Sequence, residues 1–156
     1  MRAVVQRVRE AEVVVGDESV GRIGRALVVL AGLGRDDGAE EVGWMVRKIT
    51  GLRLFDDSDA QAGHSVVEAG AEILAISQFT LLADCRKGRR PSYDHAMPAA
   101  HATALFDRFV AELRVVAGTV ATVRFGADMQ VRLVNDGPFT LVIDSPSERA
   151  SSQSKV

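Results

Sequence analysis

The sequence contains a single cysteine, Cys85, among its 156 residues. One cysteine excludes an intramolecular disulfide and fits a reducing cytosol. No apolar run approaches the ~18 residues that a membrane-spanning helix needs. Charged residues interrupt the apolar run at the start of the chain, so we expect no signal peptide. These absences predict a cytoplasmic protein that makes no use of a membrane.

Neither sign of charge dominates. Lys and Arg number 19 and Asp and Glu 21, which gives a net charge of −2. The net charge of the whole chain therefore does not predict a polyanion partner, although a local basic patch can still bind one. The sequence also has no HExxH, CxxC or His-x-x-x-His spacing, so a metal site has no local support. We expect neither a metal nor a cofactor.

A serine-hydrolase signature is missing as well. No nucleophile elbow of the GxSxG type occurs. A triad can be written on paper from Ser77 or Thr80 with His95 and Asp84, but any chain of this length offers such residue types. We interpret these side chains as surface or structural polar groups.

The composition, 47% hydrophobic and 26% charged, is that of a globular protein. We predict one domain over residues 1–145 and a polar, mobile tail over residues 146–156. Apolar residues at helical spacing predict two helices, one capped by Asp37 and one that begins at Pro98 and ends at Gly118. Strands are predicted at 3–8, 12–15, 26–33, 52–55, 73–76, 129–133 and 140–143. This order predicts an α+β fold with mainly antiparallel pairing.

Two short segments follow predicted strands, Ser-Gln-Phe-Thr at 77–80 and Asn-Asp-Gly-Pro-Phe-Thr at 135–140. Gly137 permits backbone angles that other residues avoid, and Pro138 makes a cis peptide available, although only ~5–6% of X-Pro bonds are cis. We interpret the pair as a site built from main chain, with amides of the first segment forming an oxyanion hole. A purely structural interpretation gives Phe79 a core position and makes Gly137 part of an ordinary turn.

Four cations, Arg86, Lys87, Arg89 and Arg90, lie close together after the first of these segments. One interpretation is a solvated loop that offsets acidic residues elsewhere. The other is a loop that contacts RNA phosphates, with Gly88 allowing close approach. The position of the cluster just after residues 77–80 favours the second.

Five motifs occur in order along the chain: Gln6-Arg7-Val8, Ser77-Gln78-Phe79-Thr80-Leu81, Arg90-Pro91-Ser92, Phe-Gly-Ala-Asp-Met-Gln-Val at 125–131, and Asn135-Asp136-Gly137-Pro138. Together they resemble the D-aminoacyl-tRNA deacylases, which include proteins first called D-tyrosyl-tRNA deacylases. The resemblance extends from Met1 to about Asp144 and leaves out only the polar tail.

The resemblance implies a homodimer of an α+β, barrel-like fold with two or three helices and with active sites at the subunit interface. It also implies hydrolysis of the ester that joins a D-amino acid to the terminal adenosine of tRNA. Glycyl-tRNA, including glycine mischarged on tRNA-Ala, would be cleaved as well. The partners would be the acceptor end of aminoacyl-tRNA and a second copy of the chain.

The resemblance further implies roles for individual residues. Gly137 and Pro138 would form a Gly-cisPro filter that enters the pocket of the other subunit and excludes L side chains, held there by Arg7. Phe125 and Met129 would line an adenosine pocket. The loop cations Arg86, Lys87, Arg89 and Arg90 would bind substrate.

The catalytic segment would be Ser77, Gln78, Phe79 and Thr80, acting mainly through backbone amides that polarise the ester carbonyl. Water would attack, assisted by the 2′-hydroxyl of the tRNA. A competing hypothesis makes Thr80 the nucleophile, although no base adjoins it. Two more hypotheses are a module that binds tRNA without chemistry and a purely structural dimer. The chain departs from the family at Phe139, where a small branched residue is usual, and the extra bulk bears on the geometry of the filter.

Overall fold

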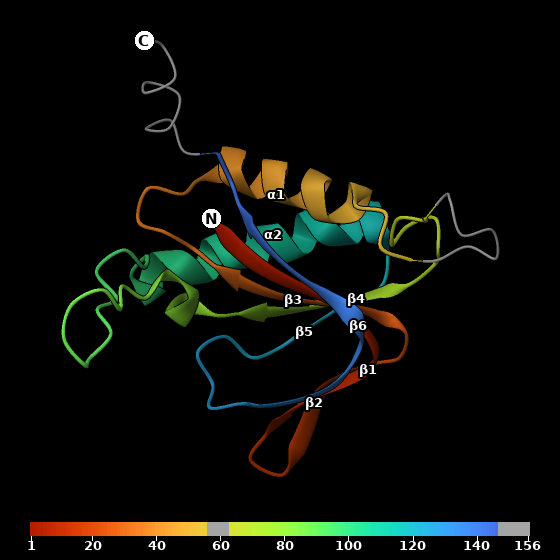
Figure 1. Ribbon diagram of the computed structural model, residues 1–156, viewed down its shortest axis with the longest axis horizontal. Coiled ribbons are helices and arrows are strands. Elements are labelled where there is room, and N and C mark those ends of the chain that lie inside the picture. The colour runs from red at the N-terminus through yellow and green to blue at the C-terminus, as the bar shows by residue number, and fades with distance from the viewer. Residues whose placement is uncertain (56–62, 147–156) are drawn as a thin grey trace.

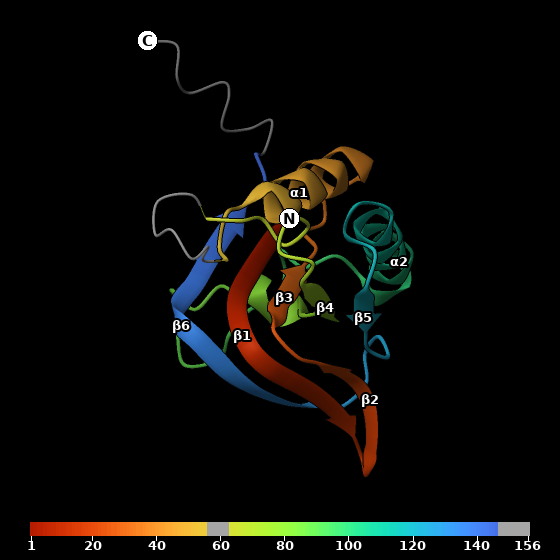
Figure 2. The ribbon, with the colours of Figure 1, turned by 90° about the vertical axis from the view of Figure 1, so that its right-hand side faces the viewer.

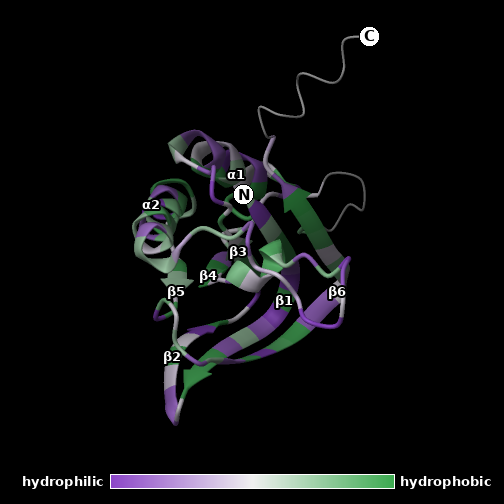
Figure 3. Cartoon of the chain, turned by 90° about the vertical axis from the view of Figure 1, so that its left-hand side faces the viewer, coloured by the Kyte–Doolittle hydropathy of each residue, from purple (hydrophilic) through white to green (hydrophobic). Residues whose placement is uncertain are grey.

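The computed structural model describes residues 1–55 and 63–146, and its framework is one long strand, β1 (Arg2–Val15). One edge of β1 pairs antiparallel with β6 (Gln130–Asp144) along nearly its whole length. The other edge pairs antiparallel first with β3 (Ala26–Gly32) and then with β2 (Glu18–Ile23). Alternate side chains of β1 are buried, and the hydropathy of this strand alternates in the same way in Figure 3.

The sheet is mixed and curls back on itself. β3 pairs in parallel with β4 (Glu72–Ser77), and β4 pairs in parallel with β5 (Val120–Thr122). β2 approaches this far edge so closely that a Cβ on Gly21 would lie 3.3 Å from Leu74 Cδ1. Figure 2 shows the resulting nearly closed, barrel-like sheet. The predicted α+β class is confirmed, although two of the five strand pairings are parallel.

Two helices cover one side of the sheet and pack against each other, α1 (Ala39–Gly51) and α2 (Ala99–Ala117) (Figure 1). Their predicted apolar faces are buried, with Phe109 of α2 and Met45 of α1 fully inaccessible. Gly118 ends α2 with a φ of 76°, in the left-handed region that glycine tolerates. Within the described part of the chain, neither helix has the length and apolar character needed to cross a bilayer.

Some predicted elements were wrong. The segments at 3–8 and 12–15 form one strand, as do those at 129–133 and 140–143. β2 and β5 were not predicted, and residues 52–55 contribute only a single bridge between Phe55 and His64. Gly38, not Asp37, caps α1, because the Glu41 carboxylate accepts a hydrogen bond from the Gly38 N–H. Asp37 instead accepts hydrogen bonds from the amine of Met1 and the N–H of Gly34.

Pro98 directly precedes α2 instead of being its first residue. Residues 147–156, nearly all of the predicted tail, lie outside the described residues, so the mobility of this tail stays a prediction.

Candidate functional site

The turn that follows β4 lies directly against the neighbouring strand, β3. Ser77 is the last residue of β4, and the chain then turns through η1 (Phe79–Leu82), a short 3-10 turn. The Gln78 N–H donates to the Ala31 carbonyl at 2.8 Å. A Cβ on Gly32 would lie 2.3 Å from Leu82 Cδ2 and 3.0 Å from the Gln78 oxygen. Glycine at position 32 therefore allows η1 to sit directly against β3.

The turn leaves backbone donors available at the strand end. The first N–H groups of a helical turn have no partner within it. Over the described ranges, the N–H groups of Phe79 and Thr80 donate no hydrogen bond. The Thr80 hydroxyl accepts a hydrogen bond from the side-chain amide of Gln78. Phe79 is 58% exposed and packs edge-on against Tyr93, with ring centroids 5.1 Å apart. Phe79 is thus a surface residue, and the interpretation that placed it in the core was wrong.

A pocket of about 240 Å³ opens beside this strand end. Its lining includes Ser77, Gln78 and Phe79 at the end of β4, and Phe125 and Met129 from the segment before β6. Two segments that are far apart in the sequence thus line one cavity. The rest of the lining is mainly apolar or small, from Ala31, Leu33, Met97, Ala102, Gly126, Ala127 and Val131.

The second segment lies within β6, not after a strand as predicted. Gln6 of β1 pairs with Thr140, and Val8 pairs with Asn135, so two steps along β1 correspond to five along β6. The residues between them, 136–139, leave the ladder as an excursion, near the bend that β6 makes in Figure 2. We call residues 136–139 the β6 excursion.

Arg7 fixes this excursion to β1. Its side chain is buried, with 5% of the residue exposed. The guanidinium donates to the Asp136 carbonyl at 3.0 Å and to the Leu54 carbonyl at 2.5 Å, and it lies 4.3 Å from the centroid of the Phe139 ring. The planar guanidinium suits this combination of carbonyl bonding and stacking. Arg7 thus holds the excursion of its own chain, and Phe139 is part of that contact.

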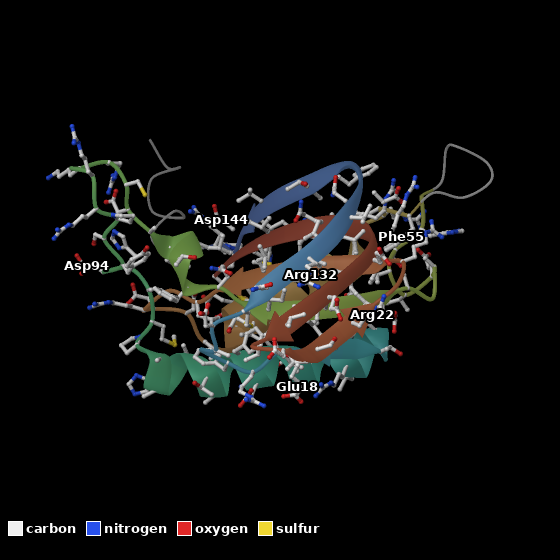
Figure 4. All side chains as sticks on the ribbon, turned by 90° about the horizontal axis from the view of Figure 1, so that it is seen from below. Glu18, Arg22, Phe55, Asp94, Arg132 and Asp144 are labelled. Atoms are coloured by element: carbon white, nitrogen blue, oxygen red, sulfur yellow. The ribbon has the colours of Figure 1, made fainter. Side chains whose placement is uncertain are left out.

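The basic cluster lies on a separate loop, which projects from one end of the molecule just before Asp94 (Figure 4). Backbone hydrogen bonds between Asp84 and Ser92 close the loop, and Gly88 turns it with a φ of 71°. Arg86 donates two hydrogen bonds to the Asp84 carboxylate, which hold the pKa of that carboxyl well below its usual range. All four cations, Arg86, Lys87, Arg89 and Arg90, are exposed.

The structure therefore brings together Ser77, Gln78 and Phe79 with Phe125 and Met129. Thr80 does not line this pocket but contacts Gln78, and Arg7 is joined to the excursion that contains Gly137 and Pro138. His95 and Asp84 line a different surface hollow from Ser77, so the triad with Ser77 is not assembled. The Thr80 hydroxyl is hydrogen-bonded to Gln78. No cluster of three or more His, Cys, Asp or Glu suited to a metal occurs in residues 1–55 and 63–146.

Sequence reasoning gave no role to Gly32 or Asn135. A glycine inside a Val- and Leu-rich strand is a signal for close backbone approach, which identifies Gly32 in retrospect. The Asn135 side chain donates to the Arg7 and Phe139 carbonyls, both at 3.1 Å. No pattern in the sequence indicates those two bonds, because their acceptors lie on the main chain.

Known proteins resemble this chain over nearly its whole length. A protein of Chlorobaculum parvum named D-aminoacyl-tRNA deacylase is 50% identical over 149 residues, which cover 95% of this chain and 100% of the relative. A protein of the same name from Desulfitobacterium hafniense is 54% identical over 145 residues, which cover 93% of this chain and 97% of the relative.

Two solved structures also resemble this chain. A protein named c-Myc DNA Unwinding Element Binding Protein superposes with a TM-score of 0.88 at 41% identity, covering 94% of this chain and 100% of its own. A probable eukaryotic D-amino acid tRNA deacylase shares the fold, with a TM-score of 0.79 at 22% identity over 91% of this chain and 97% of its own. The family model described as D-Tyr-tRNA(Tyr) deacylase matches residues 4–144. These matches confirm the resemblance read from the motifs: the chain belongs to the D-Tyr-tRNA(Tyr) deacylase family.

Proposed function

We propose that the chain hydrolyses the ester bond of D-aminoacyl-tRNA and so frees the tRNA for correct charging during translation. Its family and its relatives make it a hydrolase of aminoacyl-tRNA esters. One structural observation carries the proposal further. The segment with the available amides, at the end of β4, contributes Ser77, Gln78 and Phe79 to a pocket that Phe125 also lines. A strand end with backbone donors beside a base-sized apolar pocket suits an ester attached to a terminal nucleoside.

The chemistry follows from this arrangement. The amides of Phe79 and Thr80 donate to the ester carbonyl as negative charge develops on its oxygen, a role that is worth several kcal/mol in known oxyanion holes. Water adds to the carbonyl carbon, and the bond from that carbon to the ribose oxygen breaks. The products are the free amino acid and a ribose hydroxyl. The neighbouring 2′-hydroxyl of the tRNA assists the proton transfer.

The role of Thr80 is structural in this proposal. A threonine hydroxyl needs a neighbouring base to attack at neutral pH. The group hydrogen-bonded to Thr80 Oγ1 is the Nε2 group of Gln78, which donates in this contact and is not basic enough to take the proton of the hydroxyl. This contact supports a main-chain mechanism over a threonine nucleophile.

Selectivity for D-amino acids is assigned to the β6 excursion. Gly137 and Pro138 would enter the pocket of a second copy of the chain and place main-chain atoms where an L side chain would lie. Two features support a partner copy at this strand. β6 pairs only with β1 within the described residues, and its apolar Val131, Val134 and Val142 are exposed. Glycyl-tRNA would also be cleaved, because glycine has no side chain to exclude.

The loop cations Lys87, Arg89 and Arg90, with Arg86, would contact phosphates of the acceptor end. Since aminoacyl-tRNA is consumed in translation, the place of action would be the cytoplasm. A second candidate function is nucleic-acid binding without chemistry. It is favoured by these exposed cations and by the 41% identical structure, which is named for binding a DNA element.

Deacylation of matched D-tyrosyl- and L-tyrosyl-tRNA by the wild-type protein tests the proposal. We expect the D-ester to be cleaved and the L-ester to survive. Cleavage of both would refute the filter while leaving the esterase activity. Retention of both esters by a protein that still binds the tRNA would refute the enzyme assignment and favour the binding module.

A further inference from the structure

The side chain of Asn135 links the two ends of the β6 excursion, in addition to the contacts that Arg7 makes with it. Asn135 is the last residue of β6 paired with β1 before the excursion, opposite Val8. Its Nδ2 group donates to the Arg7 carbonyl on the neighbouring strand and to the Phe139 carbonyl at the far end of the excursion, both at 3.1 Å. One amide group thus ties together the two ends of the excursion and the strand beside it.

The same side chain closes over Gly137 from the other direction. A Cβ on Gly137 would lie 2.3 Å from Asn135 Oδ1 and 3.0 Å from the Phe139 nitrogen. Gly137 therefore lies directly against the Asn135 side chain, and its backbone angle is not in the left-handed region. The side-chain amide of Asn135 is used on both sides: its nitrogen binds the ends of the excursion, and its oxygen lies against the middle.

Two arginine side chains of β1 also hold the excursion. The Arg9 guanidinium donates to Asp136 Oδ1 at 3.2 Å. The Arg7 guanidinium holds the carbonyl of Asp136 at the start, and its stacking on the Phe139 ring holds the end. Asn135 is exposed, whereas Arg7 is buried. Removing Arg7 would therefore disturb the core, while a change at Asn135 alters the excursion with little effect on the rest of the fold.

We infer that Asn135 is a positioning residue that sets the conformation of the β6 excursion and, through it, the discrimination between D- and L-aminoacyl esters. The link to discrimination rests on the proposed function. The pinning itself rests only on the contacts of Asn135. An excursion without these two hydrogen bonds samples more conformations, and a filter made of main chain loses selectivity when its main chain moves.

Asn135→Asp is the sharpest variant, because it keeps the size of the side chain and replaces the Nδ2 donor with an oxygen that repels both carbonyls. Asn135→Ser, whose side chain is too short to reach the Phe139 carbonyl, is the second variant. Gln6→Ala is the matched control: it removes an exposed side-chain hydrogen bond between the same two strands, from Gln6 Nε2 to Thr140 at 3.0 Å, outside the excursion. Each protein is compared with the wild type by thermal melting, by amide hydrogen exchange and by deacylation of both tyrosyl enantiomers.

For both Asn135 variants we expect an unchanged melting temperature and faster exchange of the Gly137 and Phe139 amides. We also expect a D-to-L ratio of kcat/KM lowered about tenfold, the effect of roughly 1.4 kcal/mol lost from discrimination. The control should match the wild type in all three measurements. Unchanged exchange overturns the pinning, and faster exchange with an unchanged ratio overturns the positioning role. A wild type that cleaves neither ester refutes the proposed function instead, and hydrogen exchange, which needs no substrate, still decides the pinning.

Discussion

Adding one methyl group at Gly32 should displace the amides of η1, because it presses on Leu82 and on the backbone of Gln78. The new Cβ would lie 2.3 Å from Leu82 Cδ2, 3.1 Å from Leu81 Cβ and 3.0 Å from the Gln78 oxygen. The Leu82 methyl group can rotate away, but the Gln78 oxygen belongs to the backbone, so η1 must shift outward. Overpacking of this kind costs about 1–3 kcal/mol. In a domain of this size, about 2 kcal/mol lowers the melting temperature by about 4–8 °C.

The consequence for activity is larger than the consequence for stability. A displacement approaching ~1 Å at a catalytic group can reduce the rate by about 100-fold. Gly32→Ala should therefore lower kcat for D-tyrosyl-tRNA by about 10–100-fold at temperatures where the protein is folded. KM should be nearly unchanged, because the proposed phosphate contacts lie on the loop at residues 86–90. Single-turnover deacylation and a thermal melt measure both effects.

Gly24→Ala is the control, because a Cβ at position 24 meets no atom within 4 Å. It should leave the rate and the melting temperature at their wild-type values. A Gly32→Ala protein that melts earlier but deacylates at the wild-type rate would refute the claim that the position of η1 determines catalysis.

Three further predictions concern the residues around the site. Arg7→Ala leaves the carbonyls that Arg7 binds without their donor and should destabilise the protein by about 3 kcal/mol in urea unfolding; wild-type stability would contradict this. Replacing Lys87, Arg89 and Arg90 together by alanine should reduce the slope of log K against log salt for tRNA binding by about 2, and an unchanged slope would exclude phosphate contacts. Because the Asp84 pKa is lowered in the fold, its stabilising ion pair is complete above the ordinary value of about 3.9 and is lost only as the pH falls through the lower folded value. Carboxyl chemical shifts of Asp84 should stay flat above about pH 4, and a midpoint at or above ~3.9 would contradict the ion pair.

The sequence predicted the elements whose apolar residues repeat clearly. The two helices and the buried strands β3 and β4 have long apolar repeats, and their predicted cores are buried. β2 was missed because Gly21 interrupts its pattern, and the structure uses that glycine for contact with Leu74. β1 was divided because Arg9 and Glu10, both exposed, interrupt its apolar alternation.

The site was predictable where it depends on residue type and not where it depends on backbone geometry. The motifs placed Phe79 and Phe125 in one site, and they line one pocket. The excursion of β6 was mistaken for a loop, because Gly137 and Pro138 are typical turn residues and the pairing that continues beyond them depends on β1. The Asn135 side chain donates its hydrogen bonds to main-chain carbonyls. Every residue has such a carbonyl, so the residue types in the sequence do not indicate these bonds.

The central claim is that main-chain amides, with no side-chain nucleophile, carry out the hydrolysis. Single-turnover deacylation of D-tyrosyl-tRNA by Thr80→Ala tests it most directly, because this variant removes the hydroxyl and keeps the N–H of residue 80. The account predicts turnover within about tenfold of the wild type, since only the contact with Gln78 is lost. A loss of about 10⁴-fold or more, the range seen when a nucleophile is removed, would contradict it.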